Sequence, residues 1–219
     1  CGKNIGFSNP FSWPVRYNDR VVMPQNCVPY SNASGSPAMV LEDVNGWILE
    51  NKYLRCVVNK NGELVSVKKR GSEHEYLAGV GNRFLMFKDV NTCYDAWEIG
   101  SMYENLPISL NEPAEISAVQ EGCNAILQVK RKINNSTLEQ RIILSGDAER
   151  IAFETVVDWK EKHKMLKVAF PVNAYANEAY HEVQFGYVKR PVHRSYQIVM
   201  RSATTAILHL LTKPMAQLC

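Results

Sequence analysis

The residues best suited to chemistry in this 219-residue chain are two acids set among aromatic rings. Asp95 and Glu98 lie beside Tyr94 and Trp97 in one short segment. A carboxylate accepts hydrogen bonds from hydroxyl groups, and an aromatic ring offers a large apolar face to a sugar. The segment is therefore a candidate for a loop that holds a sugar in a cleft. The same residues also fit an aromatic edge of the core with solvated acids, and both interpretations stay open.

A second candidate cluster lies near the end of a predicted strand. It contains Gln184, Arg190 and His193, which offer hydrogen-bond donors and acceptors to a polar substrate. A single histidine at a strand end is also commonly satisfied by its local surroundings. Asp158 and Glu182 are more simply interpreted as outward-facing strand residues.

Alternating apolar residues predict the strands that must position these groups. Phe153, Thr155, Val157 and Trp159 share one parity, and residues at i, i+2 and i+4 lie on one face of a strand. This alternation is typical of a half-buried antiparallel strand. The charged run at 160–164 then predicts a solvated hairpin connection.

The alternation resumes after that run and recurs along most of the chain. Leu166 to Val172 predicts another strand, and 182–188 predicts a third, with Val183, Phe185 and Tyr187 on one face. Further short strands are expected at 21–23, 47–51, 54–58, 63–67, 83–87, 114–119, 125–132 and 138–144.

The segments between these strands carry turn and loop signals. Residues 26–38 are predicted to form a linker and 72–81 a polar loop, because both are rich in small and polar residues. Prolines exclude a long helix from the first 40 residues. Many short strands with turns between them predict an all-β fold, an antiparallel β-sandwich.

Composition excludes several classes of function. The hydrophobic fraction of 46% is enough for a sizeable core, and the formal charge of +3 is close to neutral. The basic runs at 68–70 and 130–132 are short and are interpreted as solvated strand ends, not as a nucleic-acid footprint. No run of 18 apolar residues exists in the sequence, so no membrane span is expected.

The six cysteines do not indicate a metal site, although their even number permits disulfides. They are far apart, with no Cys-x-x-Cys pair and no histidine at zinc-ligand spacing. Their wide separation and the expected core favour free buried thiols.

Several motifs, in order along about residues 5–193, resemble the central β-domain and the start of the C-terminal β-domain of the glycoside hydrolase family 38 α-mannosidases. The segment that begins at Tyr94 resembles the corresponding segment of the family's cytosolic and bacterial branch. The matching segments are Phe7-Ser-Asn-Pro-Phe-Ser-Trp-Pro, Ile48-Leu-Glu-Asn-Lys-Tyr-Leu-Arg, Lys60-Asn-Gly-Glu-Leu-Val-Ser, Gly81-Asn-Arg-Phe, Tyr94-Asp-Ala-Trp-Glu-Ile, Val157-Asp-Trp, His163-Lys-Met-Leu-Lys-Val-Ala-Phe-Pro and Gln184-Phe-Gly-Tyr-Val-Lys-Arg-Pro.

The resemblance implies a fold and an organisation. The fold is a large antiparallel supersandwich of the galactose-mutarotase-like kind, incomplete at its C-terminus. Residues 1–40 would form the last part of a small linking β region. Residues 41–193 would form part of the family's C-terminal β-sandwich domain. Residues 194–219 would be a divergent tail, because the match fails from Arg194 onward and Val192 replaces the family's threonine.

The resemblance also implies an activity whose main residues are absent from this chain. The family hydrolyses α-mannosides with retention, through a carboxylate nucleophile and a second carboxyl group that acts as acid and then base. Zinc or another divalent metal holds sugar hydroxyls in the complete protein. The catalytic barrel and helical bundle that carry these groups precede the matched segments, so the chain alone is expected to be inactive and to bind no metal.

On this resemblance, the substrate-binding candidates are Asp95, Trp97, Arg190 and His193. The expected partners are a mannose-containing oligosaccharide and the missing barrel and bundle, with a homo-oligomeric parent as one option. The expected compartment is the cytoplasm, with the vacuole or lysosome as alternatives. Two other interpretations stay open: a non-catalytic carbohydrate-binding β-sandwich, and an inactive product of a truncated gene.

Overall fold

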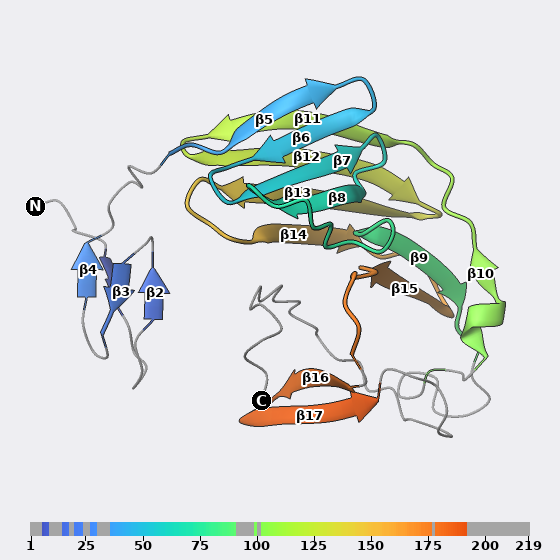
Figure 1. The fold of residues 1–219 in the computed structure, drawn as a ribbon. Coiled ribbons are helices and arrows are strands. Elements are labelled where there is room, and N and C mark those ends of the chain that lie inside the picture. The colour runs from blue at the N-terminus through green and yellow to red at the C-terminus, as the bar shows by residue number, and fades with distance from the viewer. Residues whose placement is uncertain are drawn as a thin grey trace, which may run out of the picture.

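The computed structural model describes residues 6–8, 15–17, 20–23, 27–29, 36–90, 99, 102–176 and 178–191. Two four-stranded antiparallel sheets in this part lie face to face and form a sandwich (Figure 1). The first sheet contains, in order, β5 (Met39–Asp43), β6 (Gly46–Glu50), β7 (Leu54–Asn59) and β8 (Leu64–Lys69). The second contains β11 (Ala114–Glu121), β12 (Asn124–Ile133), β13 (Ser136–Ser145) and β14 (Ile151–Asp158). The predicted antiparallel sandwich is confirmed.

A third sheet continues the fold beside the sandwich (Figure 1). Its order is β10-β9-β15, and all its pairings are antiparallel. The short 3-10 helix η1 precedes β10. The bounds of these elements are β9 (Arg83–Lys88), η1 (Tyr103–Asn105), β10 (Pro107–Ile108) and β15 (Lys164–Ala169).

Three two-stranded ladders complete the described elements. They pair β1 with β4, β2 with β3, and β16 with β17. Their bounds are β1 (Gly6–Ser8), β2 (Val15–Tyr17), β3 (Arg20–Val22), β4 (Cys27–Pro29), β16 (Glu178–Val183) and β17 (Gly186–Pro191).

Side-chain alternation creates the core between the two sheets. Leu49, Cys56 and Val58 of the first sheet pack with Leu127 and Ile142 of the second in one buried cluster. Each belongs to the inward parity of its strand, as the period of two requires. A smaller second cluster lies between β9 and the adjoining ends of β12 and β13, and consists of Met86, Ile133 and Leu138.

Three predictions of local structure were wrong, and one strand was missed. The connection at 160–164 is not a hairpin, because β14 pairs with β13 whereas β15 pairs with β9. The stretch 182–188 is not one strand, since Gln184 and Phe185 form the turn between β16 and β17. The predicted linker at 26–38 contains β4, and the edge strand β5 was not predicted. The strands predicted at 21–23, 47–51, 54–58, 63–67, 83–87, 114–119, 125–132 and 138–144 are confirmed, with ends shifted by up to two residues, as β3, β6, β7, β8, β9, β11, β12 and β13.

Candidate functional site

A cavity of about 600 Å³ lies where the third sheet meets the sandwich. Its walls come from β9, β10, the segment at 109–112, the turn before β8 and one side chain of β12. Ligand pockets in proteins commonly have volumes of about 300–1,000 Å³ and a few converging polar groups on a mainly apolar wall. The charged side chains that line this cavity are Glu63, Arg83, Glu112 and Arg131.

Arg131 enters the cavity because of its place in the alternation of β12. Leu127, Val129 and Ile133 point inward on the same strand, so Arg131 has the inward parity as well. It lies between Val129 of the first core cluster and Ile133 of the second. Only 7% of Arg131 is exposed. The interpretation of 130–132 as a solvated strand end was therefore wrong for its central residue.

The neighbouring strand β13 also carries a buried polar residue, two positions after Leu138, which is the partner of Arg131 in the ladder. Gln140 of β13 pairs with Val129 of β12 and lies between the inward residues Leu138 and Ile142. Gln140 Oε1 accepts a hydrogen bond of 2.7 Å from Asn82 Nδ2, and Gln140 Nε2 donates to Thr155 Oγ1 at 2.9 Å. Asn82, Gln140 and Arg131 thus form a line of buried polar residues between the two apolar clusters, here called the polar seam.

Two charged groups at this cavity have buried atoms without a partner. Among the described residues, no group accepts a hydrogen bond from Arg131 Nε, and none donates one to Glu112 Oε2. Leaving a buried polar atom unsatisfied costs about 1–3 kcal/mol, and more when the group is charged. Both atoms are covered by the fold, so Arg131 and Glu112 line the cavity with other atoms than these.

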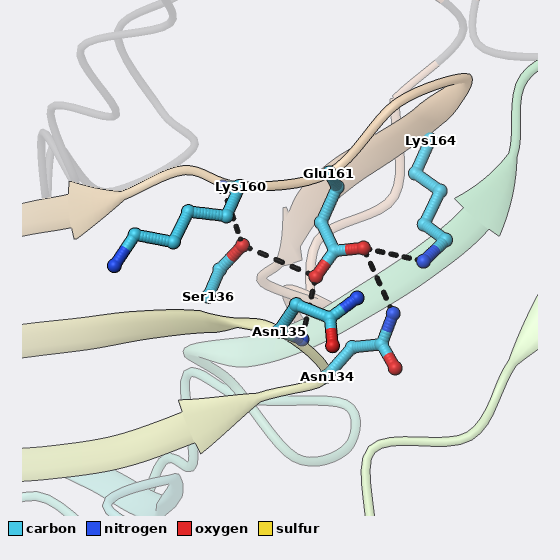
Figure 2. A network of polar contacts seen from close by, with 6 residues as sticks. All are labelled: Asn134, Asn135, Ser136, Lys160, Glu161 and Lys164. Atoms are coloured by element: carbon cyan, nitrogen blue, oxygen red, sulfur yellow. Dashed lines mark hydrogen bonds and ion pairs between the residues drawn. The ribbon is translucent and has the colours of Figure 1, made fainter.

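A second polar site joins the turn between β12 and β13 to the segment between β14 and β15 (Figure 2). Glu161 Oε1 accepts hydrogen bonds from the backbone N–H of Asn135 at 2.6 Å and from Ser136 Oγ at 3.2 Å. Glu161 Oε2 accepts from Asn134 Nδ2 at 2.8 Å and from the ammonium group of Lys164. Lys160 contributes its backbone N–H, which donates to Ser136 Oγ at 2.9 Å.

These contacts explain the charge state of Glu161. The hydrogen bond from Lys164 is the largest cause that lowers the pKa of Glu161, from an ordinary 4.5 to about 2. Burial opposes the shift, whereas the donors of Asn135 and Asn134 support it. The side chain of Glu161 is 1% exposed, so the prediction of a solvated charged run was wrong here. Every oxygen of this carboxylate has a partner, and we assign it a structural role.

Most of the predicted substrate-binding residues lie outside the described residues. This holds for Tyr94, Asp95, Trp97, Glu98 and His193, and they stay predictions.

The described members of the second cluster are separated on one hairpin. Gln184 is exposed in the turn between β16 and β17, whereas Arg190 is half-buried near the opposite end of β17, across from Ala179. The structure does not bring these two side chains together. Asp158 is outward-facing, as predicted, and forms an ion pair of 2.7 Å with Lys160.

Metal binding finds no support among the described residues. No group of three or more His, Cys, Asp and Glu side chains in that part of the chain could hold a metal ion. Cys56 is a free thiol in the core, and its burial raises its pKa to about 12, which keeps it protonated. Its buried state confirms the prediction of free buried thiols at this position. No helix in the described part is long and apolar enough to cross a membrane.

The cavity residues Glu112 and Arg131 were not among the predicted site residues. The parity of Arg131 with Val129 and Ile133 was the signal that could have identified it, since a charged residue at an inward position requires a reason. Glu112 gives no such signal, because it lies in the irregular segment before β11.

Comparisons with known proteins relate most of the chain to one family. Residues 49–206 match the family of glycosyl hydrolases family 38 C-terminal domains. This match extends past residue 193. The start of a divergent tail at 194 stays a prediction.

Three relatives agree with that match. The human protein alpha-mannosidase 2C1 is 32% identical over 166 residues, which cover 72% of this chain and 16% of the relative. Alpha-mannosidase G of Dictyostelium discoideum is 31% identical over 171 residues, covering 73% of this chain and 16% of the relative. The alpha-mannosidase of Saccharomyces cerevisiae is 26% identical over 166 residues, covering 67% of this chain and 15% of the relative.

The chain therefore spans about one sixth of the length of these relatives. The family match covers well over half of the chain, and the structure is the antiparallel sandwich that the family motifs imply. On these grounds, the chain belongs to glycoside hydrolase family 38, within its C-terminal domain.

Proposed function

We propose that the chain is a non-catalytic part of an α-mannosidase that removes terminal α-D-mannosyl residues from oligosaccharides. The observation that carries this proposal is the match of residues 49–206 to the family's C-terminal domain, together with relatives that are all named α-mannosidases. The nucleophile, the acid/base residue and the divalent metal then belong to the preceding barrel and bundle. Zinc is the metal that we expect there.

The role of this chain in such an enzyme is to complete and support the catalytic region. The retaining mechanism needs two carboxyl groups about 5–5.5 Å apart. We assign both to the barrel, with Asp95 and Trp97 as substrate contacts from the sandwich side. The likeness of the Asp95 segment to the cytosolic branch supports a cytoplasmic location.

The test is hydrolysis of p-nitrophenyl α-D-mannoside by the 219-residue chain and by a longer protein that carries the same residues after a family barrel. Both are assayed with and without added zinc or cobalt. We expect activity in the longer protein alone. Activity of the short chain would overturn the proposal and direct attention to Asp95 and Glu98, with Asp95→Asn as the diagnostic variant.

Inactivity of both proteins would favour a second candidate function, a carbohydrate-binding sandwich without catalysis. The cavity beside β9 and β10 supports that alternative, because charged side chains of both signs and apolar side chains line it together. Retention on immobilised mannose without hydrolysis would distinguish it from an inactive chain.

A further inference from the structure

We propose that the free edge of β11 pairs with β11 of a second copy of this chain, so that one antiparallel sheet runs through both copies. The inference concerns assembly, and it does not rest on the proposed function. β11 is an edge strand, because its sheet has the order β11-β12-β13-β14 (Figure 1). An edge strand presents a row of main-chain N–H and C=O groups with which another strand can pair.

The first argument is that β11 is the longest open edge of the sandwich in the described part of the chain. The loop after β8 covers that edge through bridges at Glu75 and Gly81. The ring of Phe170 packs against Phe153 of β14, the opposite edge strand of the second sheet. β5 has five residues, whereas β11 has eight. No described residue forms a main-chain hydrogen bond or bridge with β11 on the side away from β12.

The second argument is the direction of the main-chain groups of β11. Its hairpin with β12 closes at the pair Glu121↔Asn124, with two residues between them. The closing pair of such a hairpin is hydrogen-bonded, and hydrogen-bonded pairs alternate with non-hydrogen-bonded pairs along an antiparallel ladder. Every second residue of β11 therefore directs its N–H and C=O away from β12, into the open edge. These residues are Ala114, Ile116, Ala118 and Gln120.

The third argument is that β11 can pair with a second β11 in a two-fold register. The residues with outward main-chain groups must lie opposite one another, and a two-fold axis at Ser117 meets this condition. Ile116 then lies opposite Ala118 of the second copy, and Ala114 lies opposite Gln120. Each of these pairs can exchange two main-chain hydrogen bonds. Two-fold interfaces, in which both copies use the same surface, are the commonest in soluble oligomers.

Charge favours this register over its neighbours. With the axis at Ser117, Glu115 lies opposite Val119 of the second copy, and no like charges face each other. An axis one residue later would place Glu115 opposite Glu121, and like charges directly opposite each other are destabilising. An axis one residue earlier would shorten the paired stretch to 114–118. The register at Ser117 is therefore the one that we expect.

The fourth argument is that β11 lacks the features that normally keep edge strands apart. Lysine, proline and β-bulges serve this purpose in natural sheets. β11 has the sequence Ala-Glu-Ile-Ser-Ala-Val-Gln-Glu, and its pairing with β12 shows no register shift. Ala118 has the parity of Ile116, which packs against the first core cluster, yet Ala118 is exposed. A second β11 would cover this apolar position.

The experiment begins with light scattering during size-exclusion chromatography of the 219-residue chain. We expect a concentration-dependent dimer with about twice the 24.8 kDa mass of one chain. Ala118→Pro should raise the dissociation constant about tenfold or more, because it removes an outward N–H from each copy. The ladder with β12 does not use this N–H, and proline is tolerated at such edge positions. The variant should therefore unfold in urea like the parent chain.

A disulfide tests the register itself. Residues in a non-hydrogen-bonded antiparallel pair have Cα atoms about 4.5 Å apart, a distance that a disulfide spans. Ser117→Cys should therefore form a covalent dimer under mild oxidation. Gln128→Cys is the matched control, because Gln128 is exposed and is the partner of Ser117 in the ladder with β12. The Cα atoms of the two Gln128 residues would lie about 14 Å apart across the dimer, too far for a bridge.

A chain that stays monomeric at its highest soluble concentration would overturn the proposal. A dimer whose dissociation constant is the same in Ala118→Pro would overturn it too, and so would equal cross-linking of the two cysteine variants. If Ala118→Pro does not fold, the two cysteine variants still decide the question. A monomeric chain whose β11 amides gain protection from hydrogen exchange only in the longer family protein would mean that a segment of that protein occupies the edge, and the proposal would be wrong.

Discussion

Glu161 carries its charge where almost no solvent reaches it, and four donors make that charge stable. An isolated buried carboxylate would take up a proton because desolvation penalises the charged form. Here the ammonium of Lys164 and the donors of Asn134, Asn135 and Ser136 reverse that balance. The result is a pKa of about 2, well below the ordinary 4.5.

A lowered carboxylate pKa makes folding stability depend on pH in a defined direction. The contribution of Glu161 is fully present above its unfolded pKa of about 4.5 and is lost as the pH falls towards about 2. We therefore expect Glu161→Gln to lower the urea midpoint clearly at pH 7. The difference from the parent chain should shrink steadily between pH 4.5 and pH 2. Urea unfolding followed by tryptophan fluorescence across this range measures it.

Glu139→Gln is the control, because Glu139 forms an exposed ion pair with Lys130 on the outer face of β12 and β13. The turn between these two strands is the one that holds Glu161. Exposed pairs of this kind contribute little to stability. If the urea midpoints of Glu161→Gln and the parent chain differ by the same amount down to pH 2, the network does not stabilise the charge of Glu161.

Arg131 and Glu161 show why charged residues were predicted less well than apolar ones. Both stand in runs of charge, and a run of charge predicts a solvated surface. Arg131 follows the inward parity of β12, and Glu161 is drawn in by donors from the turn between β12 and β13. The second cause depends on a contact 26 positions away in the chain, so no local pattern contains it.

At the scale of elements, turns at one end of the sandwich are joined by a single asparagine. Asn51 Nδ2 donates to the carbonyl oxygens of Ser145 at 2.7 Å and Ala148 at 2.8 Å. Its Oδ1 accepts from the backbone N–H groups of Tyr53 and Leu54, both at 2.8 Å. Asn51 thereby fixes the turn between β6 and β7 against the turn after β13. It belongs to one of the family motifs, and its role is structural.

The start of β6 depends on a glycine for reasons of space. Gly46 has φ +151°, and a Cβ at this position would lie 2.0 Å from the carbonyl oxygen of Val58 and 2.9 Å from the Cα of Asn59. These are backbone atoms of the paired strand β7, so they cannot move without disturbing the ladder. We expect Gly46→Ala to destabilise the fold by about 3 kcal/mol or more, from the clash and the backbone strain together.

Gly71→Ala is the comparison for this prediction. Gly71 also has a positive φ of +76°, but an added Cβ would meet nothing within 4 Å. Only the conformational penalty of about 1–2 kcal/mol applies there. Urea unfolding of both variants measures the difference, and equal losses would contradict the steric argument for Gly46.

The elements that were predicted and those that were missed differ in burial. β7, β13 and β12 from Leu127 onward alternate between buried residues and more exposed ones, so their period was visible in the sequence. β5 has no buried residue, and its apolar Met39 and Leu41 are about half exposed. The hairpin β16–β17 was misread because Phe185 continues the apolar parity through a turn, where it has φ 64° and is fully exposed.

At the scale of the molecule, the core is not one continuous apolar body. The polar seam of Asn82, Gln140 and Arg131 lies between the cluster of the sandwich and the cluster under the third sheet. Asn82 and Gln140 satisfy each other, whereas Arg131 faces the cavity. The third sheet therefore meets the sandwich through polar contacts as well as apolar ones, and the cavity lies at that junction.

This organisation predicts an order of local stability along the chain. β12 and β13 are the central strands of their sheet, and both contribute residues to the two core clusters. β16 and β17 pair only with each other among the described strands, and Tyr180, Tyr187 and the turn residue Phe185 are exposed. Opening free energies within one protein range from near zero to the global value, according to such burial.

Hydrogen exchange of the 219-residue chain, followed by mass spectrometry of its peptides, tests this order. We expect amides of β12 and β13 to exchange last and those of β16 and β17 to exchange early, because exchange in the hairpin needs the loss of only one ladder. The third sheet should fall between them, since β9 is paired on both sides and packs on the smaller cluster. Protection of β16–β17 equal to that of β12 would contradict this order and would mean that the hairpin is covered by a surface not among its described contacts. The same measurement on the longer family protein shows whether its catalytic region covers the hairpin. If it does, the amides of β16 and β17 exchange late in the longer protein and early in the 219-residue chain.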